Sequence, residues 1–342
     1  MSEDRNKRDV PVAVVGAGSW GTALALLLHR QGHEVRLWAF GEEVVRDIRA
    51  RGENSGYLPD VPVPSSLFIT SSLEEAIAGA SVMVSVSPSQ YVSGIMDTAA
   101  QYLDPEVQVI SASKGIEIRT LRRMDEVYRD VLAADQMEQF TVLSGPSFAV
   151  EVAREVPTAV AVASRSADAR ARAQHLFQTD IFRVYTNDDV VGVELGGALK
   201  NVIALAAGVA AGLGFGQNTL AALITRGLAE MSRLGVALGA KRETFSGLAG
   251  LGDLVLTCMG ELSRNRTVGY RLGRGESLDE ILADMRAVAE GVHTTPAVQE
   301  LALRAGVEMP IATEVQAILE GRDPREAVQN LLQRDPKPED WA

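Results

Sequence analysis

The sequence predicts an α/β domain built on a mostly parallel sheet, followed by an all-helical domain. In the first half of the chain, short apolar runs rich in valine alternate with helical stretches. This alternation is typical of parallel strands whose two faces are covered by helices. Beyond residue 187 the pattern is helical to the end of the chain. We therefore expect one domain at residues 1–187 and a second at residues 188–342.

The expected strands are short apolar runs, and they lie at Val10–Val15, Glu34–Trp38, Leu67–Thr70, Ser81–Ser87, Val107–Ala112, Phe140–Leu143, Thr158–Ala163 and Ile181–Tyr185. Helical periodicity marks the stretches between them, at Ser19–His29, Leu73–Ala78, Tyr91–Tyr102 and Leu121–Ala133. The helices expected in the second domain are Asp188–Ala211, Leu220–Leu238, Thr267–Leu272, Leu278–Ala287, Thr295–Ala305 and Ile311–Leu319.

Composition excludes several classes of protein. Of the 342 residues 46% are hydrophobic and 23% charged, as in globular proteins, and the lone Cys258 excludes an intrachain disulfide. The net charge of −12 disfavours binding to nucleic acid. The longest apolar run, Val202–Gly216, is shorter than the ~20 residues of a membrane helix. The charged start of the sequence lacks a signal peptide, so we expect a cytoplasmic protein without an integral membrane segment.

A glycine-rich turn follows the first expected strand. Gly16, Gly18 and Gly21 form a GxGxxG pattern that opens a helix, which is the context of a dinucleotide-binding fingerprint. The first glycine permits the tight turn, the second lets the backbone approach a pyrophosphate, and the third lets the helix pack on the strand. The first domain is therefore predicted to be Rossmann-like.

The second expected strand is followed by Ala39, Phe40 and Gly41, without the acidic residue that holds a ribose hydroxyl in many NAD sites. No arginine is present there to bind the 2′-phosphate of NADP either. Arg46 and Arg49, on the following helix, are alternative phosphate ligands, although a solvated helix face is an equally good explanation of both.

Ligands of open parallel sheets bind beyond the carboxyl ends of the strands. Two such ends carry polar side chains: Lys114 follows one apolar run, and Ser147 lies in the turn Ser144–Ala149 that opens a short helix. A third end, Ser87-Pro88-Ser89, is a candidate cofactor contact. An ordinary loop is the alternative interpretation of each.

A lysine interrupts the most apolar helix. Between Leu195 and Gly216 the only polar side chains are Lys200 and Asn201. A helix that is apolar all round is buried, and lysine is rarely buried without a function or a partner. Burial lowers the pKa of an ammonium group, which suits general acid–base catalysis near neutral pH. The alternative is a lysine whose head reaches water along the core surface.

Ser263, Arg264, Asn265 and Arg266 precede a helical stretch and suggest an anion site. Ser263 is a candidate N-cap, and arginine in a first turn opposes the helix dipole unless an anion binds there. Upstream, Asp253 follows a glycine-rich turn and is a candidate acceptor for substrate hydroxyls, or a cap. The four histidines show no ligand spacing, so we predict no metal, and Cys258 has no catalytic context.

In their order and combination these motifs resemble the bacterial-type NAD(P)-dependent glycerol-3-phosphate dehydrogenases over nearly the whole chain. The stretches that carry the resemblance are GAGSWGTALA at Gly16–Ala25, ASKGIE at Ala112–Glu117, SGPSFA at Ser144–Ala149, GVELGGALKNVIALAAG at Gly192–Gly208, LITRGLAEMSRLG at Leu223–Gly235, GLAGLGDLVLTC at Gly247–Cys258, SRNRTVG at Ser263–Gly269 and AEGVHT at Ala289–Thr294.

The resemblance implies reversible reduction of dihydroxyacetone phosphate to sn-glycerol 3-phosphate with NAD(P)H, for phospholipid synthesis, in a homodimer. It makes Lys200 the catalytic acid–base group. Implied substrate residues are Lys114, Gly145, Ser147, Lys200, Asp253, Ser263, Arg264 and Asn265. Implied cofactor residues are Gly16, Gly18, Ser19, Trp20, Gly21, Phe40, Lys114, Ala149, Arg264, Val288 and Glu290. At the position of Phe40 the family often has a histidine or arginine.

Three alternatives remain from the residues alone. A ketopantoate or hydroxyisobutyrate type of reductase has the same two domains but no need of the Ser263–Arg266 cluster. A non-enzymatic NAD(P)-sensing module would not need Lys200 in an apolar helix. A partner-binding helical domain would direct the apolar helix at another chain.

Overall fold

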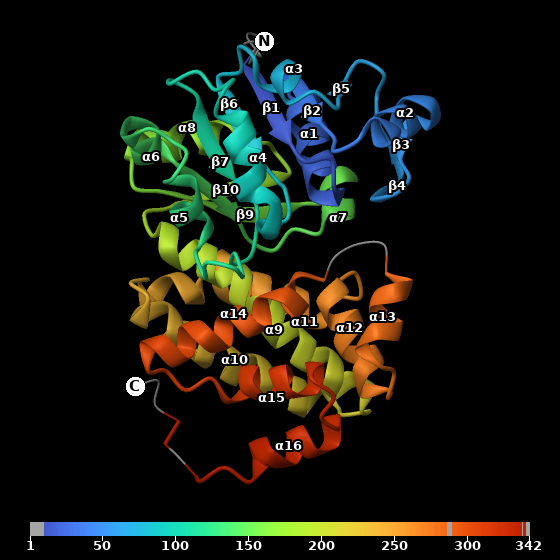
Figure 1. The fold of residues 1–342 in the computed structure, drawn as a ribbon, viewed down its shortest axis with the longest axis vertical. Helices are drawn as coiled ribbons and strands as arrows, with labels where there is room; N and C mark the ends of the chain where they lie inside the picture. Colours follow the sequence, from blue (N-terminus) through green and yellow to red (C-terminus); the bar gives the residue numbers. More distant parts are fainter. Residues whose placement is uncertain (1–9, 286–288, 337, 340–342) are drawn as a thin grey trace. The chain divides into compact units, whose positions relative to one another are not determined.

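The computed structural model describes residues 10–285, 289–336 and 338–339, and the chain forms two compact units (Figure 1). The first unit contains the described residues up to Ser113 together with Met124–Leu143 and Ser147–Val190. The second contains Lys114–Arg123, Ser144–Pro146 and the described residues from Val191 onward. Two short segments from the part of the sequence expected in the first domain thus pack with the second unit.

The first unit is built on an eight-stranded sheet with the strand order β10-β9-β8-β7-β6-β1-β2-β5. Its strands are β1 (Pro11–Val15), β2 (Glu34–Trp38), β5 (Phe68–Thr70), β6 (Val82–Ser85), β7 (Gln108–Ser111), β8 (Thr141–Ser144), β9 (Thr158–Ser164) and β10 (Phe182–Asn187). β1 pairs in parallel with both β2 and β6, and the pairs β2–β5, β6–β7, β7–β8 and β9–β10 are parallel too. The predicted mostly parallel sheet is confirmed.

The order of the strands reverses between β1 and β6, since β2 and β5 lie on one side of β1 and the later strands on the other. Ligands of such sheets bind in the crevice at this switch point. The turn that follows β1 lies against the end of β6: a Cβ atom placed on Gly16 would lie 3.0 Å from the Val86 carbonyl group. The glycine-rich turn therefore occupies the position where a ligand is expected.

Helices cover both faces of this sheet, because every residue of β6, β7 and β8 is buried although successive side chains point to opposite faces. The helices of the unit are α1 (Ser19–Arg30), α2 (Glu42–Arg51), α3 (Leu73–Ile77), α4 (Val92–Ala99), α5 (Met124–Tyr128), α6 (Ala134–Gln139), α7 (Ala149–Ala153) and α8 (Ala167–Phe177), with the short η1 (Ser89–Tyr91).

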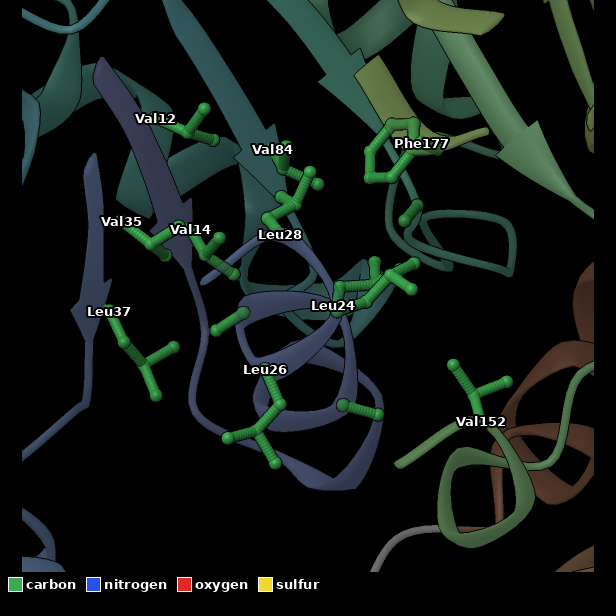
Figure 2. Packing of buried hydrophobic residues seen from close by; sticks show 14 of the residues in the cluster. Val12, Val14, Leu24, Leu26, Leu28, Val35, Leu37, Val84, Val152 and Phe177 are labelled. Atoms are coloured by element: carbon green, nitrogen blue, oxygen red, sulfur yellow. The ribbon is translucent and has the colours of Figure 1, made fainter. Parts of the chain in front are cut away.

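The core on the α1 side of the sheet is mainly aliphatic. Val14 of β1, Val84 of β6, and Leu24 and Leu28 of α1 belong to one buried cluster (Figure 2). A two-stranded antiparallel ribbon, β3 (Glu53–Asn54) and β4 (Leu58–Pro62), follows α2. Leu58 of this ribbon belongs to the same cluster, so the ribbon is anchored to the core.

The second unit is helical in all of its described residues apart from turns and an isolated bridge between Glu117 and Arg122. Its elements are α9 (Val190–Gly212), α10 (Gln217–Ala237), η2 (Arg242–Ser246), η3 (Leu248–Gly252), α11 (Asp253–Met259), α12 (Arg264–Gly273), α13 (Leu278–Asp284), α14 (Glu290–Ala305), α15 (Pro310–Leu319) and α16 (Pro324–Leu332). The predicted all-helical second part of the chain is confirmed.

The central helix α9 is long and apolar enough to cross a membrane by length and composition alone, but 89% of its most apolar window is buried inside the protein. Val202, Ile203 and Leu205 of this helix are part of the core of the second unit. Its apolar character is therefore that of a core helix, as expected.

Two local predictions were wrong, and α16 was among the elements that were missed. A helix over Leu121–Ala133 is interrupted because Leu121 has a φ of +60° and Arg122 pairs with Glu117, which leaves only α5 in that stretch. α14 begins at Glu290, ahead of the expected Thr295, and continues past Pro296. α16 was not expected, although Asp323 caps it and Pro324 occupies its first turn, which is a helix-start signal.

We predict that Gly21→Ala disrupts the first unit. A Cβ atom at Gly21 would lie 1.7 Å from the carbonyl oxygen of Gly16, and neither backbone segment can move away without breaking the contact of α1 with β1. Chemical unfolding should show a free energy of unfolding lowered by about 3 kcal/mol or more, the upper end of the effects of overpacking a core.

Gly18→Ala is the matched control, because a Cβ atom at Gly18 meets nothing within 4 Å. It should change the free energy of unfolding by less than about 1 kcal/mol. Equal stability of the Gly21→Ala variant and the unaltered protein would contradict the close packing of this turn.

Candidate active site

The second unit contains a buried carboxylate that bridges two lysines. Asp253 accepts hydrogen bonds from Lys200 Nζ at Oδ1, at 2.5 Å, and from Lys114 Nζ at Oδ2, at 2.7 Å. Lys200 is 6% exposed and Asp253 is buried as well. Lys114 also donates to the carbonyl oxygen of Gly145 at 3.2 Å. Three residues predicted separately from the sequence are thus brought together by direct contacts.

Two glycines of α9 let this cluster form. A Cβ atom at Gly196 would lie 2.5 Å from the carbonyl oxygen of Ala249, so α9 packs directly on the backbone of η3. A Cβ atom at Gly197 would lie 2.9 Å from Ser144 Oγ and 3.5 Å from Lys114 Cγ, so the stem of Lys114 passes over this glycine. One helical turn later, α9 presents Lys200 to Asp253.

Asp253 is positioned by an unusual backbone. It is the first residue of α11 and follows η3, a single π-helical turn, a feature often found at functional sites. Thr257 lies one turn further along the same helix face; it donates to the Asp253 carbonyl oxygen at 2.6 Å and accepts from Lys200 Nζ at 2.8 Å. Thr257 was not predicted as a site residue, although its spacing of four residues from Asp253 is the signal that could have found it.

The electrostatics of the cluster favour titration near neutral pH. Burial lowers the pKa of Lys200 from 10.5 to about 8; the Asp253 carboxylate opposes that shift and the Lys114 ammonium adds to it. Burial raises the pKa of Asp253, but the two ammonium groups outweigh it and hold the pKa below its usual value. Asp253 therefore stays ionised while Lys200 can gain or lose a proton in the physiological range.

Asp253 has partners that were not predicted. Its contact with substrate hydroxyls stays a prediction, and in this structure its two carboxylate oxygens accept hydrogen bonds from Lys114 and Lys200. The Lys200 ammonium uses two of its three protons on Asp253 and Thr257, and the described residues provide no acceptor for the third. Lys200 and Lys114 therefore each keep one N–H without an acceptor among the described residues, and of the two lysines Lys200 is the buried one.

A chain of amide groups connects three helices next to this cluster. Asn201 Oδ1 accepts from Asn265 Nδ2 at 3.0 Å, and Asn265 Oδ1 accepts from the backbone N–H of Gly291 at 2.8 Å. Both asparagines are buried. The chain fixes α12 and the start of α14 to α9, one residue beyond Lys200. Asn201, the other polar residue of this apolar helix, thus has Asn265 as its partner.

The predicted anion site lies at the start of α12. Ser263 is its N-cap, because its side chain accepts from the backbone N–H of Arg266 at 3.2 Å, as expected. Arg264 is the exposed first residue of the helix, which has no acidic residue in its first turn. The Ser263 hydroxyl proton, the Arg264 guanidinium and the second N–H of the Asn265 amide can all donate to an anion.

In the first unit, the glycine-rich turn leads into α1 as predicted. Gly16 has a φ of +126°, which only glycine adopts easily, and Gly18 is the N-cap without any side-chain cap. The first turn of α1 has no acidic residue, and its N–H groups have no partners within the helix. Open space at Gly18 and an uncapped positive helix end fit the pyrophosphate of a dinucleotide.

Two family descriptions match the chain. The N-terminal part of the NAD-dependent glycerol-3-phosphate dehydrogenases matches residues 11–170, and their C-terminal part matches residues 189–329. The chain belongs to this family. A relative from Geobacter sulfurreducens, named glycerol-3-phosphate dehydrogenase [NAD(P)+], is 56% identical over 331 residues, 96% of this chain and 99% of the relative. One of the same name from Citrifermentans bemidjiense is 54% identical over 96% of this chain and 98% of its own length.

Solved structures agree with this family assignment. The crystal structure of glycerol-3-phosphate dehydrogenase from Coxiella burnetii has a TM-score of 0.90 and 42% identity, and the match covers 95% of this chain and 99% of that one. A ketopantoate reductase from Ralstonia eutropha has a TM-score of 0.58 at 17% identity, over 93% of this chain and 99% of that one. The second likeness shows a shared fold only.

Other residues implied by the family resemblance are placed as follows. Phe40 is 80% exposed beyond β2, and Trp38 contacts it edge-on at 6.2 Å between ring centroids. Arg46 is exposed on α2, whereas Arg49 is tied to the carbonyl oxygen of Ile69 at 2.6 Å. Arg49 is therefore a structural residue, and Arg46 remains the candidate for a phosphate contact.

The remaining implied residues lie at the ends of elements. Ser19 and Trp20 open α1, Ala149 opens α7 after the turn that contains Ser147, and Glu290 opens α14. Gly145 has a φ of +138°, so the turn after β8 requires glycine there. Val288 lies outside the described residues.

Metal and thiol chemistry receive no support from the described residues. Within residues 10–285, 289–336 and 338–339, no group of three histidine, cysteine, aspartate or glutamate side chains is arranged to hold a metal ion. Burial raises the pKa of the Cys258 thiol to about 12, so this cysteine stays protonated and is a poor nucleophile.

We predict that Gly18→Ala weakens dinucleotide binding while the fold is retained. The methyl group points into space that is open in the structure and that a pyrophosphate would approach. Fluorescence titration should show a Kd for NADPH raised by at least about tenfold, which corresponds to ~1.4 kcal/mol. Unchanged affinity would contradict the placement of the pyrophosphate at this turn.

Proposed function

We propose that this chain catalyses the reversible NAD(P)H-dependent reduction of dihydroxyacetone phosphate to sn-glycerol 3-phosphate, a precursor of glycerophospholipids. The observation that carries the proposal is the buried Lys114–Asp253–Lys200 cluster in a chain that belongs to the NAD-dependent glycerol-3-phosphate dehydrogenase family. The relatives that are 54% and 56% identical bear the name of this activity.

Lys200 is the acid–base group. Reduction of a ketone places negative charge on its oxygen, and that oxygen must take up a proton. When bound, the reduced nicotinamide supplies the hydride for the carbonyl carbon. The free N–H of the Lys200 ammonium donates to the carbonyl oxygen, stabilises the developing charge and transfers its proton. In the oxidation of glycerol 3-phosphate, neutral Lys200 takes the proton of the hydroxyl group.

Asp253 positions Lys200 and raises the pKa of its ammonium group. Its carboxylate fixes the ammonium group at 2.5 Å and stabilises the protonated form, which offsets part of the effect of burial. The same carboxylate holds Lys114, which in this proposal contacts substrate and cofactor. Without this carboxylate, the buried ammonium group of Lys200 and the half-buried one of Lys114 would repel each other.

The substrate phosphate binds at the start of α12. Ser263, Arg264 and Asn265 donate to it from a hydroxyl group, a guanidinium and an amide, at a positive helix end. Asn265 is held for this task by Asn201 and Gly291. Binding energy from this remote group orients the carbonyl carbon for reaction.

The other residue roles of the proposal follow the resemblance. Gly145 and Ser147 contact substrate. Cofactor contacts come from the turn at Gly16, Gly18, Ser19, Trp20 and Gly21, and from Phe40, Lys114, Ala149, Arg264, Val288 and Glu290. The fit of the glycine turn and the uncapped start of α1 to a pyrophosphate supports the first of these groups. We also propose that the protein is cytoplasmic and that it forms a homodimer. Light scattering can test the homodimer.

The ketopantoate type of reductase, an alternative from the residues alone, has only the fold in common with this chain. The cluster at Ser263–Asn265 favours a phosphorylated substrate over ketopantoate, which has no phosphate.

We predict that Lys200→Met lowers kcat for dihydroxyacetone phosphate by at least about a hundredfold, the usual contribution of general acid catalysis. The KM for the substrate should change less, because the phosphate contacts remain. Lys241→Met is the matched control, since Lys241 is exposed, and it should keep the activity of the unaltered protein. A Lys200→Met enzyme with kcat within about tenfold of the unaltered protein would remove Lys200 from the mechanism.

The rate of glycerol 3-phosphate oxidation should rise with pH through about 8, because Lys200 must be neutral to accept a proton. Reduction of dihydroxyacetone phosphate should fall over the same range as the ammonium is lost. The Lys200→Met enzyme should lack both dependences, and steady-state rates at saturating substrate from pH 6 to pH 10 would show whether it does.

Arg264→Ala should raise the KM for dihydroxyacetone phosphate about ten- to a hundredfold, since a charge-assisted contact contributes ~1.5–3 kcal/mol. Unphosphorylated dihydroxyacetone should be a poor substrate, and its KM should not respond to the substitution. Arg274→Ala, which alters an exposed arginine at the other end of α12, is the control. An equal change in KM for both ketones would refute the phosphate site.

A further inference from the structure

The antiparallel ribbon β3–β4 makes two hydrogen bonds to the glycine-rich turn of the first unit. Asn54, at the end of β3, is 2% exposed, and its Nδ2 group donates to the carbonyl oxygen of Ala17 at 2.9 Å and to Thr22 Oγ1 at 2.9 Å. The hydroxyl of Ser19 donates to the carbonyl oxygen of Tyr57, in the loop of the ribbon. A segment more than thirty residues away in the sequence therefore fixes the turn.

The bond to Ala17 determines the direction of a neighbouring N–H. The carbonyl group of Ala17 and the N–H of Gly18 belong to one planar trans peptide, in which the two groups point in opposite directions. Because Asn54 holds the carbonyl group on the ribbon side, the N–H of Gly18 points away from the ribbon. Gly18 borders the open space at the start of α1, so this N–H is available to an anion.

We propose that Asn54 is a positioning residue for dinucleotide binding: through the Ala17 carbonyl it orients the Gly18 N–H toward the pyrophosphate. This inference rests on the proposed NAD(P)H-dependent function. Asn54 lies outside the glycine motif and is not among the residues implied by the family resemblance. A glycine-rich turn has many accessible conformations, and Asn54 selects the one in which the backbone donor faces the ligand.

The test uses Asn54→Asp in the full-length protein. The carboxylate is nearly isosteric with the amide, but when ionised it cannot donate to Ala17 and repels that carbonyl oxygen. Isothermal titration should show a Kd for ADP-ribose, which contains the pyrophosphate but no nicotinamide, raised by about tenfold. The KM for NADPH should rise in parallel, whereas kcat at saturating NADPH should stay within about twofold of the unaltered enzyme.

Two matched controls separate this role from general support of the ribbon. Thr22→Val removes the second acceptor of Asn54 but keeps the bond to Ala17. Ser55→Ala removes a hydrogen bond from the same ribbon to Asp47 on α2, 2.7 Å long, without touching the glycine-rich turn. Both variants should bind ADP-ribose like the unaltered protein.

A lower pH provides a further readout should Asn54→Asp destabilise the fold. A protonated aspartic acid can again donate to Ala17, so the affinity of this variant for ADP-ribose should recover toward pH 5, while that of the unaltered protein stays level. Equal affinity of Asn54→Asp and the unaltered protein, an equal loss in Thr22→Val, or a fall in kcat with unchanged KM would overturn the inference. Failure of the unaltered protein to bind ADP-ribose or NADPH would instead refute the proposed function.

Discussion

A buried carboxylate between two lysines is the interaction on which the second unit depends. Asp253 shares its two oxygens between the buried Lys200 and the half-buried Lys114, and neither Asp253 nor Lys200 could be buried at low cost alone. Removal of one partner from a buried ion pair leaves an uncompensated charge, which is strongly destabilising. The cluster therefore constrains three separate segments of the chain at once and gives the catalytic proposal its geometry.

Close backbone packing in the surrounding fold allows this cluster to form. Gly196 and Gly197 remove the side chains that would keep α9 from η3 and from the stem of Lys114. The amide chain from Asn201 through Asn265 to Gly291 then fixes the start of α12 relative to the same turn of α9. The proposed proton donor and the proposed anion site are thus both fixed to α9, an arrangement that would orient a small phosphorylated ketone.

Local patterns were enough to predict much of the architecture. The strand–turn–helix context of Gly16–Gly21 identified the dinucleotide fold, and the apolar surroundings of Lys200 indicated a buried lysine with a shifted pKa. The Ser263 cap was predicted correctly because a cap depends on residues three apart. Each of these signals is contained within a few neighbouring residues.

Contacts between distant segments could not be predicted in this way. Asp253 lies 53 residues from Lys200 and 139 from Lys114, and no periodicity connects them. For the same reason the contacts of Asp253 with both lysines were not predicted, and Asn54 was overlooked because it is 37 residues from the turn that it holds. The expected helix at Leu121–Ala133 is broken because Leu121 adopts a positive φ. A leucine in the sequence gives no indication of such a conformation.

The pKa of Lys200 tests the central claim most directly. The chain has five lysines, so the signals of ¹³Cε-labelled lysine can be assigned and titrated by NMR, with Lys200→Met identifying the signal. The account predicts a pKa of about 8 for Lys200, and a lower value in Asp253→Asn, where the stabilising carboxylate is absent. A Lys200 pKa near the ordinary 10.5 in both proteins would contradict the account, because neither burial nor Asp253 would then control the proposed proton donor.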